Sequence, residues 1–317
     1  MIRFLLRRIG TMVISLIGAT IVVFGLAHAK DDPINVFIRA EGYAIGPEQI
    51  AALRAKWGLD RPIVLQYLTW LGNIARADLG RSVGSNRKVT DILRERWPAT
   101  MQLAVGAWIV GTFVGIPLGI LSAMRRASIL DYFLRAFALS GQSVPAFWVG
   151  IVGIWIFAVY LGWLPVPTFY GRTDASFFGQ FQYFVMPVLV LSWGPIAGYL
   201  RITRSAMLEV LDSEYIKLAR AKGMGYPRVV AKHAFRNALI QPLTVSALLL
   251  AGFMDGAVLV ENVFVWPGVG QIAVAAVNDN DFTLLTGIVF LFTILYLAMS
   301  FVADLLYVVI DPRIRLE

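Results

Sequence analysis

The sequence predicts an all-α, polytopic membrane protein, and three features lead to this fold class. First, 58% of its 317 residues are hydrophobic and 15% are charged, whereas soluble domains average about 45–50% and about 25%. Second, six apolar stretches approach or exceed the roughly 20 residues that a helix needs to cross a bilayer. Third, the basic residues behind the net charge of +8 cluster at the edges of those stretches. Membrane orientation explains this clustering better than binding of nucleic acid does.

Residues 1–29 contain the first predicted span. Arginines precede an apolar run over residues 9–27, which places the N-terminus on the cytoplasmic side. Ala-His-Ala at 27–29 is similar to a signal-peptidase site, so cleavage is an alternative. The run is longer than the roughly 7–15 apolar residues of a signal peptide. We therefore expect an uncleaved span.

Residues 30–98 form a hydrophilic insertion that we expect outside the cytoplasm. Within it, apolar residues recur at helical spacing over 48–57 and over 62–77. The insertion is rich in arginine and lysine, but the charge rule of membrane topology weakens in loops longer than about 60 residues. The sequence therefore predicts a helical extracytoplasmic insertion between the first two spans.

Residues 99–317 are predicted to form a five-helix transmembrane core. The second span, over 100–124, repeats glycine at 111, 115 and 119, a ridge that lets another helix pack closely. Gly-Gln-Ser-Val-Pro at 141–145 interrupts the third span, which covers 132–163. The fourth span, over 183–200, is expected to be interrupted as well, because it contains two prolines and two glycines.

The last two predicted spans cover residues 239–260 and 282–310, which leaves the C-terminus inside as well. Phe-Val-Trp-Pro-Gly-Val-Gly at 264–270 cannot be a continuous helix and predicts a loop or re-entrant turn. A charge at membrane depth costs roughly 2.5–3.5 kcal/mol and therefore indicates function. An interfacial or inter-helix pair is the alternative for Asp255, and for Asp304 we expect such a pair. The residues that we expect to line a translocation path are Ser143, Pro145, Phe147, Asp255, Glu261 and Trp266.

Residues 201–237 form a polar, basic segment between the fourth and fifth spans. Asp212-Ser213 offers an N-cap, and Gly223 stands where a C′ glycine would end the helix. Pro227 suits the first turn of a second helix that runs to about Phe235. The pattern predicts two short helices on the cytoplasmic side. A solvated basic loop that only fixes orientation is the alternative.

Two runs in this segment, Ala-Arg-Ala-Lys-Gly at 219–223 and Lys-His-Ala-Phe-Arg-Asn at 232–237, resemble the coupling loop of ABC-transporter permeases of the dipeptide, oligopeptide and nickel type. The resemblance implies that the first short helix docks on an ATPase subunit. It assigns this contact to Glu214, Tyr215, Lys217, Leu218, Ala219, Arg220, Ala221, Lys222 and Gly223. Of the general importer signature only Ala219 and Gly223 agree, so the match is to the peptide-permease variant.

The resemblance extends over nearly the whole chain. It includes Asp-Leu-Gly-Arg-Ser at 78–82, Arg-Trp-Pro-Ala-Thr at 96–100, Leu-Gly-Trp-Leu-Pro at 161–165 and Asp-Pro-Arg at 311–313. It implies an inner-membrane location in contact with lipid. The partners that it implies are a second permease of similar fold, two ATPase subunits and an extracytoplasmic substrate-binding protein. ATP and Mg would bind to the ATPase chains, and no cofactor to this one.

The predicted function is therefore that of a permease subunit in an ATP-driven importer of di- or oligopeptides. The chain lacks a phosphate-binding Gly-x-x-x-x-Gly-Lys-Ser/Thr loop, cysteines and a pair of neighbouring histidines, so we expect neither an enzyme nor a metal site. An ion-coupled transporter or channel that uses the intramembrane carboxylates is the alternative from another class. Nickel, glutathione or another small solute are alternative substrates, because the binding protein selects the substrate.

Overall fold

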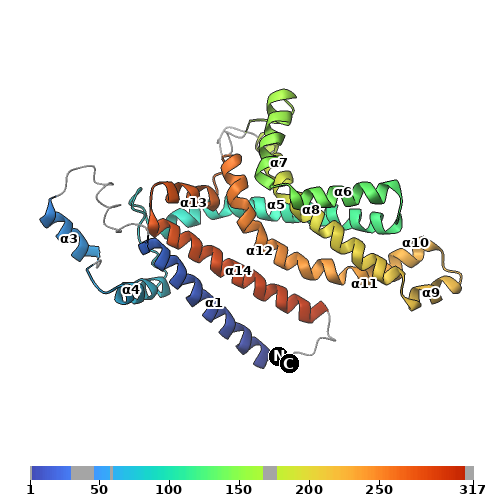
Figure 1. The fold of residues 1–317 in the computed structure, drawn as a ribbon, viewed down its shortest axis with the longest axis horizontal. Coiled ribbons are helices and arrows are strands. Elements are labelled where there is room, and N and C mark those ends of the chain that lie inside the picture. Colours follow the sequence, from blue (N-terminus) through green and yellow to red (C-terminus); the bar gives the residue numbers. More distant parts are fainter. Residues whose placement is uncertain (1, 30–45, 58–59, 167–176, 311–317) are drawn as a thin grey trace. The chain divides into compact units, whose positions relative to one another are not determined.

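The computed structural model describes residues 2–29, 46–57, 60–166 and 177–310. Along this part of the chain helices follow one another, and its only β pairing is an isolated bridge between Arg81 and Lys88 (Figure 1). The all-α fold class is confirmed. The chain divides into two compact units: the first contains Met1–Ala99 and Pro267–Leu297, and the second contains Thr100–Trp266 and Ala298–Arg315.

Four of the described helices are long and apolar enough to cross a membrane. They contain the spans Leu6–Gly25, Val89–Met124, Phe181–Leu211 and Phe282–Leu305, and the bent pair Ile129–Ser143 and Ala146–Tyr160 makes a fifth if it counts as one span. These five coincide with the first four predicted spans and the sixth. The predicted fifth span coincides with helix α12 (Ile240–Val263), and the count of six stays a prediction.

In the first unit, helix α4 (Ile63–Ala75) packs on α1 (Ile2–Ala29). Tyr67 of α4 shares a hydrogen bond of 3.0 Å with the Thr20 hydroxyl of α1. The rings of Tyr67 and Trp70 lie 5.4 and 5.6 Å from the ring of Phe24. Helix α3 (Pro47–Trp57) precedes α4, so both helices of the insertion are confirmed close to their predicted bounds.

The rest of the first unit is organised around the beginnings of α5 (Val89–Met124), α13 (Val269–Asn278) and α14 (Phe282–Ile310). Val89, Val269 and Ile288 form its buried apolar core. Buried Asp281 caps α14 by accepting a hydrogen bond from the backbone N–H of Leu284 at 3.0 Å. The same carboxylate accepts bonds from the Ser82 hydroxyl, at 2.6 Å, and from the backbone of the loop that follows Ser82. This loop is therefore tied to the start of α14.

In the second unit, the glycine ridge of α5 packs on α8 (Phe177–Leu211). A Cβ atom at Gly115 would lie 2.8 Å from the carbonyl oxygen of Ile196, and one at Gly119 would lie 2.7 Å from that of Leu200. Such distances are shorter than carbon–oxygen contacts allow, so only glycine permits this approach. The ridge is confirmed as a helix-packing surface.

The predicted interruption of the fourth span is wrong. Pro187 and Pro195 lie inside α8, which stays helical throughout. The close packing of α5 on α8 supports this course, since membrane helices tolerate proline where neighbouring helices hold the backbone. In contrast, α6 (Ile129–Ser143) and α7 (Ala146–Gly153) meet at a bend of 104° with Pro145 at the N-cap of α7, as predicted (Figure 1).

Candidate coupling surface and polar path

Of the predicted coupling segment, residues 201–211 belong to the long helix α8, and the remainder is built of short helices. Helix α9 is Glu214–Ala221, and after a break come α10 (Tyr226–Val229), a π-helical turn (Val230–Ala234) and α11 (Phe235–Ala238). The break near Gly223 and the proline in the first turn of α10 are confirmed. The predicted end near Phe235 is wrong, because the chain stays helical almost to α12. No glycine or proline lies between Phe235 and Ile240 to stop it.

The end of α9 explains the need for glycine at position 223. The backbone N–H of Gly223 donates to the carbonyl of Arg220 at 2.9 Å, and that of Met224 donates to Ala219 at 3.3 Å. This pair of bonds is the Schellman motif, which requires a left-handed residue at C′. Gly223 has φ of +80°. The prediction that Gly223 ends the helix as its C′ residue is therefore confirmed, and the left-handed backbone is the reason.

The beginning of α9 differs from a capped helix in one respect. Ser213 stands at the N-cap, as predicted, but makes no capping bond with its side chain. Its hydroxyl donates instead to the carbonyl of Val210 at the end of α8. Glu214 in the first turn pairs with Lys217 at 2.6 Å on the exposed side, a contact that typically contributes little.

The inner face of α9 is packed against the ends of other helices. Ile216 and Ala219 are buried in a cluster with residues of α5, α8, α10 and α11. The cluster consists of Ala123, Ala206, Met207, Leu211, Ile216, Ala219, Val229, Val230, Ala234 and Ala238. Asn237 of α11 also donates to the Tyr215 hydroxyl at 3.0 Å. These short helices are thus packed together around a buried apolar cluster and do not form a solvated loop.

The outer face of α9 combines apolar and basic side chains. Tyr215 is 45% exposed and Leu218 is 58% exposed. Lys217 and Arg220 are exposed beside them, and the Arg220 guanidinium lies 5.3 Å from the centre of the Tyr226 ring. We name Tyr215, Lys217, Leu218 and Arg220 the docking face. An exposed leucine that is surrounded by cations and lies above a packed cluster has the chemistry of a protein-binding surface.

The six residues of the predicted path do not share one surface. Glu261 is fully buried at 0% exposure and accepts a hydrogen bond of 2.7 Å from the Thr100 hydroxyl. Trp266 is buried too, with its ring 5.8 Å from that of Phe184. Three others surround the bend between α6 and α7 and are exposed: Ser143, Pro145 and Phe147. Asp255 belongs to α12, but its side chain lies outside the described residues.

The chain around Trp266 follows its prediction more closely. Helix α12 ends at Val263 and α13 begins at Val269, so the expected loop is confirmed. The backbone N–H of Trp266 donates to the carbonyl of Glu261 at 2.8 Å, and Val265 takes a left-handed φ of +49°. The path itself stays a prediction.

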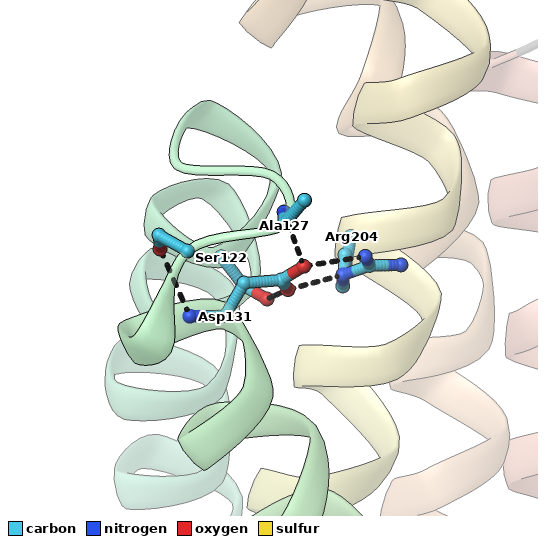
Figure 2. Close-up of polar contacts among 5 residues, drawn as sticks. Ser122, Ala127, Asp131 and Arg204 are labelled. Atoms are coloured by element: carbon cyan, nitrogen blue, oxygen red, sulfur yellow. Dashed lines mark hydrogen bonds and ion pairs between the residues drawn. The ribbon is translucent and has the colours of Figure 1, made fainter.

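A buried ion pair between α6 and α8 was not predicted from the sequence. Asp131, 1% exposed, receives two hydrogen bonds from Arg204, from Nε to Oδ1 at 2.8 Å and from Nη2 to Oδ2 at 2.9 Å (Figure 2). The Ser122 hydroxyl and the backbone N–H of Ala127 also donate to this carboxylate. Ser128 caps α6 by accepting from the Asp131 N–H. The local signal was the Ser-x-x-Asp spacing at the helix start, which is similar to a capping box.

This geometry can be compared with known proteins. The family described as binding-protein-dependent transport system inner membrane component matches residues 115–316, and the N-terminal component of such membrane proteins matches residues 1–104. The chain belongs to this family. The expected family resemblance is therefore confirmed, and the ion-coupled alternative loses its support.

Individual relatives of this binding-protein-dependent permease align along the whole chain. It is 36% identical to the dipeptide transport system permease protein DppB of Escherichia coli K12 over 99% of both chains. It is 34% identical to the oligopeptide transport system permease protein AppB of Bacillus subtilis over 99% of this chain and 100% of that protein. An inward-facing structure of the MetNI methionine ABC transporter covers 70% of this chain and 97% of its own, with TM-score 0.57 and 18% identity. That likeness shows the fold.

Membership of the family fixes the general role of the molecule. The permease is a multi-pass component of the inner membrane. It is a transport subunit and not an enzyme, in agreement with the prediction from its sequence. Its partners include an ATPase and a substrate-binding protein.

Proposed function

We propose that this permease forms the translocation path of an ATP-driven importer for di- or oligopeptides. The observation that carries the proposal is the alignment of the dipeptide and oligopeptide permeases over essentially the whole chain. The similarity thus includes the insertion and the coupling segment as well as the spans. Nickel, glutathione and other small solutes are the alternative substrates.

In this proposal the importer contains a second permease of similar fold, two ATPase subunits and an extracytoplasmic binding protein. Both termini and the coupling segment lie in the cytoplasm, and residues 30–98 lie outside. The docking face of α9 binds an ATPase subunit, which holds the ATP and Mg. Closure of the ATPase pair on ATP displaces α9 and shifts the helix bundle between inward-open and outward-open states. The exposed Leu218, on the opposite face of α9 from the buried cluster, supports this role.

Uptake by the reconstituted importer tests the proposal. Proteoliposomes that contain both permeases and the ATPases would be supplied with the binding protein and, in turn, with labelled dipeptide, oligopeptide, nickel and glutathione. We expect peptide uptake that requires both ATP and the binding protein. Uptake of nickel or glutathione alone would assign another substrate, and uptake driven by an ion gradient without ATPase would contradict the proposal.

The buried carboxylate of Glu261 allows a test of the path. We expect Glu261→Ala to lower transport more than Asp304→Ala does at equal membrane expression. Glu261 is fully buried on Thr100, whereas Asp304 is half-buried in α14. Glu261→Gln is the matched variant that keeps an acceptor for Thr100. Equal losses from the two alanine variants would place the path elsewhere.

A further inference from the structure

A cavity of about 530 Å³ lies between α6 and α8 and has no role in the proposed transport cycle. Three of its lining residues are arginines: Arg135, Arg201 and Arg204. The rest of the lining consists of Tyr132, Leu139, Gln142, Leu200 and three small residues, and none of the lining residues is acidic. The cavity is thus a basic site with partly apolar walls.

The three guanidiniums are held by different contacts. The Asp131 carboxylate, which is not part of the cavity lining, accepts hydrogen bonds from Nε and Nη2 of Arg204. Arg201 donates from Nη1 to Oε1 of Gln142 at 2.9 Å, and Arg135 lies 5.7 Å from the centre of the Tyr132 ring. Each guanidinium has five N–H donors, so these contacts leave further donors on every one. Asp131 neutralises one charge, and Gln142 and Tyr132 neutralise none.

Two of these arginines also stand towards the end of an apolar helix that is long enough to cross a membrane. Arg201 and Arg204 belong to the candidate span Phe181–Leu211, one helical turn apart. Arginines at the end of a span can meet the anionic headgroups at the membrane surface. Tyr132 and Leu139, at 59% and 67% exposure, place large apolar surfaces beside the basic groups. This combination fits a ligand with an anionic head and an apolar body.

We propose that the cavity binds the phosphate of an anionic phospholipid from the cytoplasmic leaflet, with an acyl chain against the exposed apolar side chains. Basic pockets between membrane helices on the cytoplasmic side bind such headgroups. The cytoplasmic placement rests on the topology proposed above, but the site is independent of which substrate is carried. A free phosphate offers the same anionic chemistry without the apolar body, so the experiment separates the two.

Native mass spectrometry of the purified importer, with its partner subunits bound, tests this site. The probes are phosphatidylglycerol, phosphatidylcholine with the same acyl chains, and inorganic phosphate. The variant is Arg135→Gln with Arg201→Gln, which leaves the Asp131–Arg204 pair intact. Arg125→Gln, an exposed arginine at the end of α5 that does not line the cavity, is the matched control. Arg135→Gln alone serves if the double variant is unstable.

We expect the double variant to bind phosphatidylglycerol about thirtyfold more weakly than the unmodified protein, and the single variant about fivefold. The control should bind it unchanged, and phosphatidylcholine and inorganic phosphate should bind weakly to all forms. Equal binding of phosphatidylglycerol by both variants and the unmodified protein would overturn the proposal. So would phosphatidylcholine or inorganic phosphate binding as tightly as phosphatidylglycerol. If the unmodified importer binds phosphatidylglycerol as expected but takes up no peptide, the proposed transport function fails and the lipid site stands.

Discussion

The coupling segment and the insertion over residues 30–98 look alike in sequence but differ in structure. Both are basic, helical and flanked by apolar spans. The coupling segment has its own buried cluster and presents Leu218 and Tyr215 above it. In the insertion, α4 rests on α1 with one face and exposes Ile63, Val64 and Leu68 on another. Charge alone therefore does not distinguish a segment that has its own buried cluster from one that covers the face of another helix.

The difference matters because a mechanical coupling element must be stiff. A helix joined to its neighbours by a packed core moves with them, since protein interiors deform little. The cluster beneath α9 includes residues of α5 and α8, which belong to candidate spans. We therefore expect that force applied to the docking face is passed to those spans.

The largest effect is expected from Gly223→Val in the coupling segment. A β-branched residue at φ of +80° costs roughly 1–2 kcal/mol and breaks the Schellman turn that ends α9. We expect ATP-driven uptake to be abolished and the ATPase to bind weakly or not at all, while membrane insertion is normal. Uptake and co-purification of the ATPase measure both.

Two controls isolate this effect. Gly225→Val changes a neighbouring glycine that has a negative φ of −63° and no atom within 4 Å of its missing Cβ, so it should retain uptake. Arg87→Ala in the insertion removes only an exposed pair with Glu95 and should also retain it. Normal uptake by Gly223→Val with the ATPase still bound would mean that the segment is merely a linker.

The next effect concerns stability and compares two ion pairs. Asp131→Ala removes the buried partner of Arg204, and we expect a loss of about 2–4 kcal/mol in the free energy of unfolding. Glu95→Ala removes the exposed partner of Arg87 in the other region, for which about 0–1 kcal/mol is typical. Thermal unfolding in detergent measures both variants. Similar unfolding temperatures for the two would show that the buried pair does not hold α6 to α8.

A smaller and local effect is expected from Asp281→Ala in the first unit. The change removes the cap of α14 and the acceptor of the Ser82 hydroxyl, for which about 1–2 kcal/mol is typical. Amide hydrogen exchange should rise over residues 82–86, while co-purification of the ATPase should not change. Loss of the ATPase in this variant would show that the two regions are coupled more tightly than we propose.

The sequence allowed local features to be predicted where a residue has one physical solution. Gly223 ends α9 because the turn needs a left-handed residue, and Pro145 starts α7 after a break. The glycines at 111, 115 and 119 face α8 because only they allow such close packing. These constraints act within a few residues or repeat at helical spacing, so they are visible in the chain itself.

Features that depend on distant partners could not be predicted in the same way. Pro187 and Pro195 signal a break by local rules, yet packing keeps α8 helical. Asp131 and Arg204 lie 73 positions apart, and no local pattern joins them. Ser213 occupies its predicted N-cap but bonds backward to Val210, because the end of α8 offers a competing carbonyl.

We propose that the docking face of α9 contacts the ATPase on the cytoplasmic side. The chain has no cysteine, so Leu218→Cys introduces a single reactive thiol at an exposed position, and Ser85→Cys places one on the insertion as a control. We predict that an impermeant maleimide labels the Leu218→Cys protein only from the cytoplasmic side, and that bound ATPase protects it. The Ser85→Cys protein should be labelled only from outside, with or without ATPase. Equal labelling of the Leu218→Cys protein in the presence and absence of ATPase would show that the docking face does not contact the ATPase.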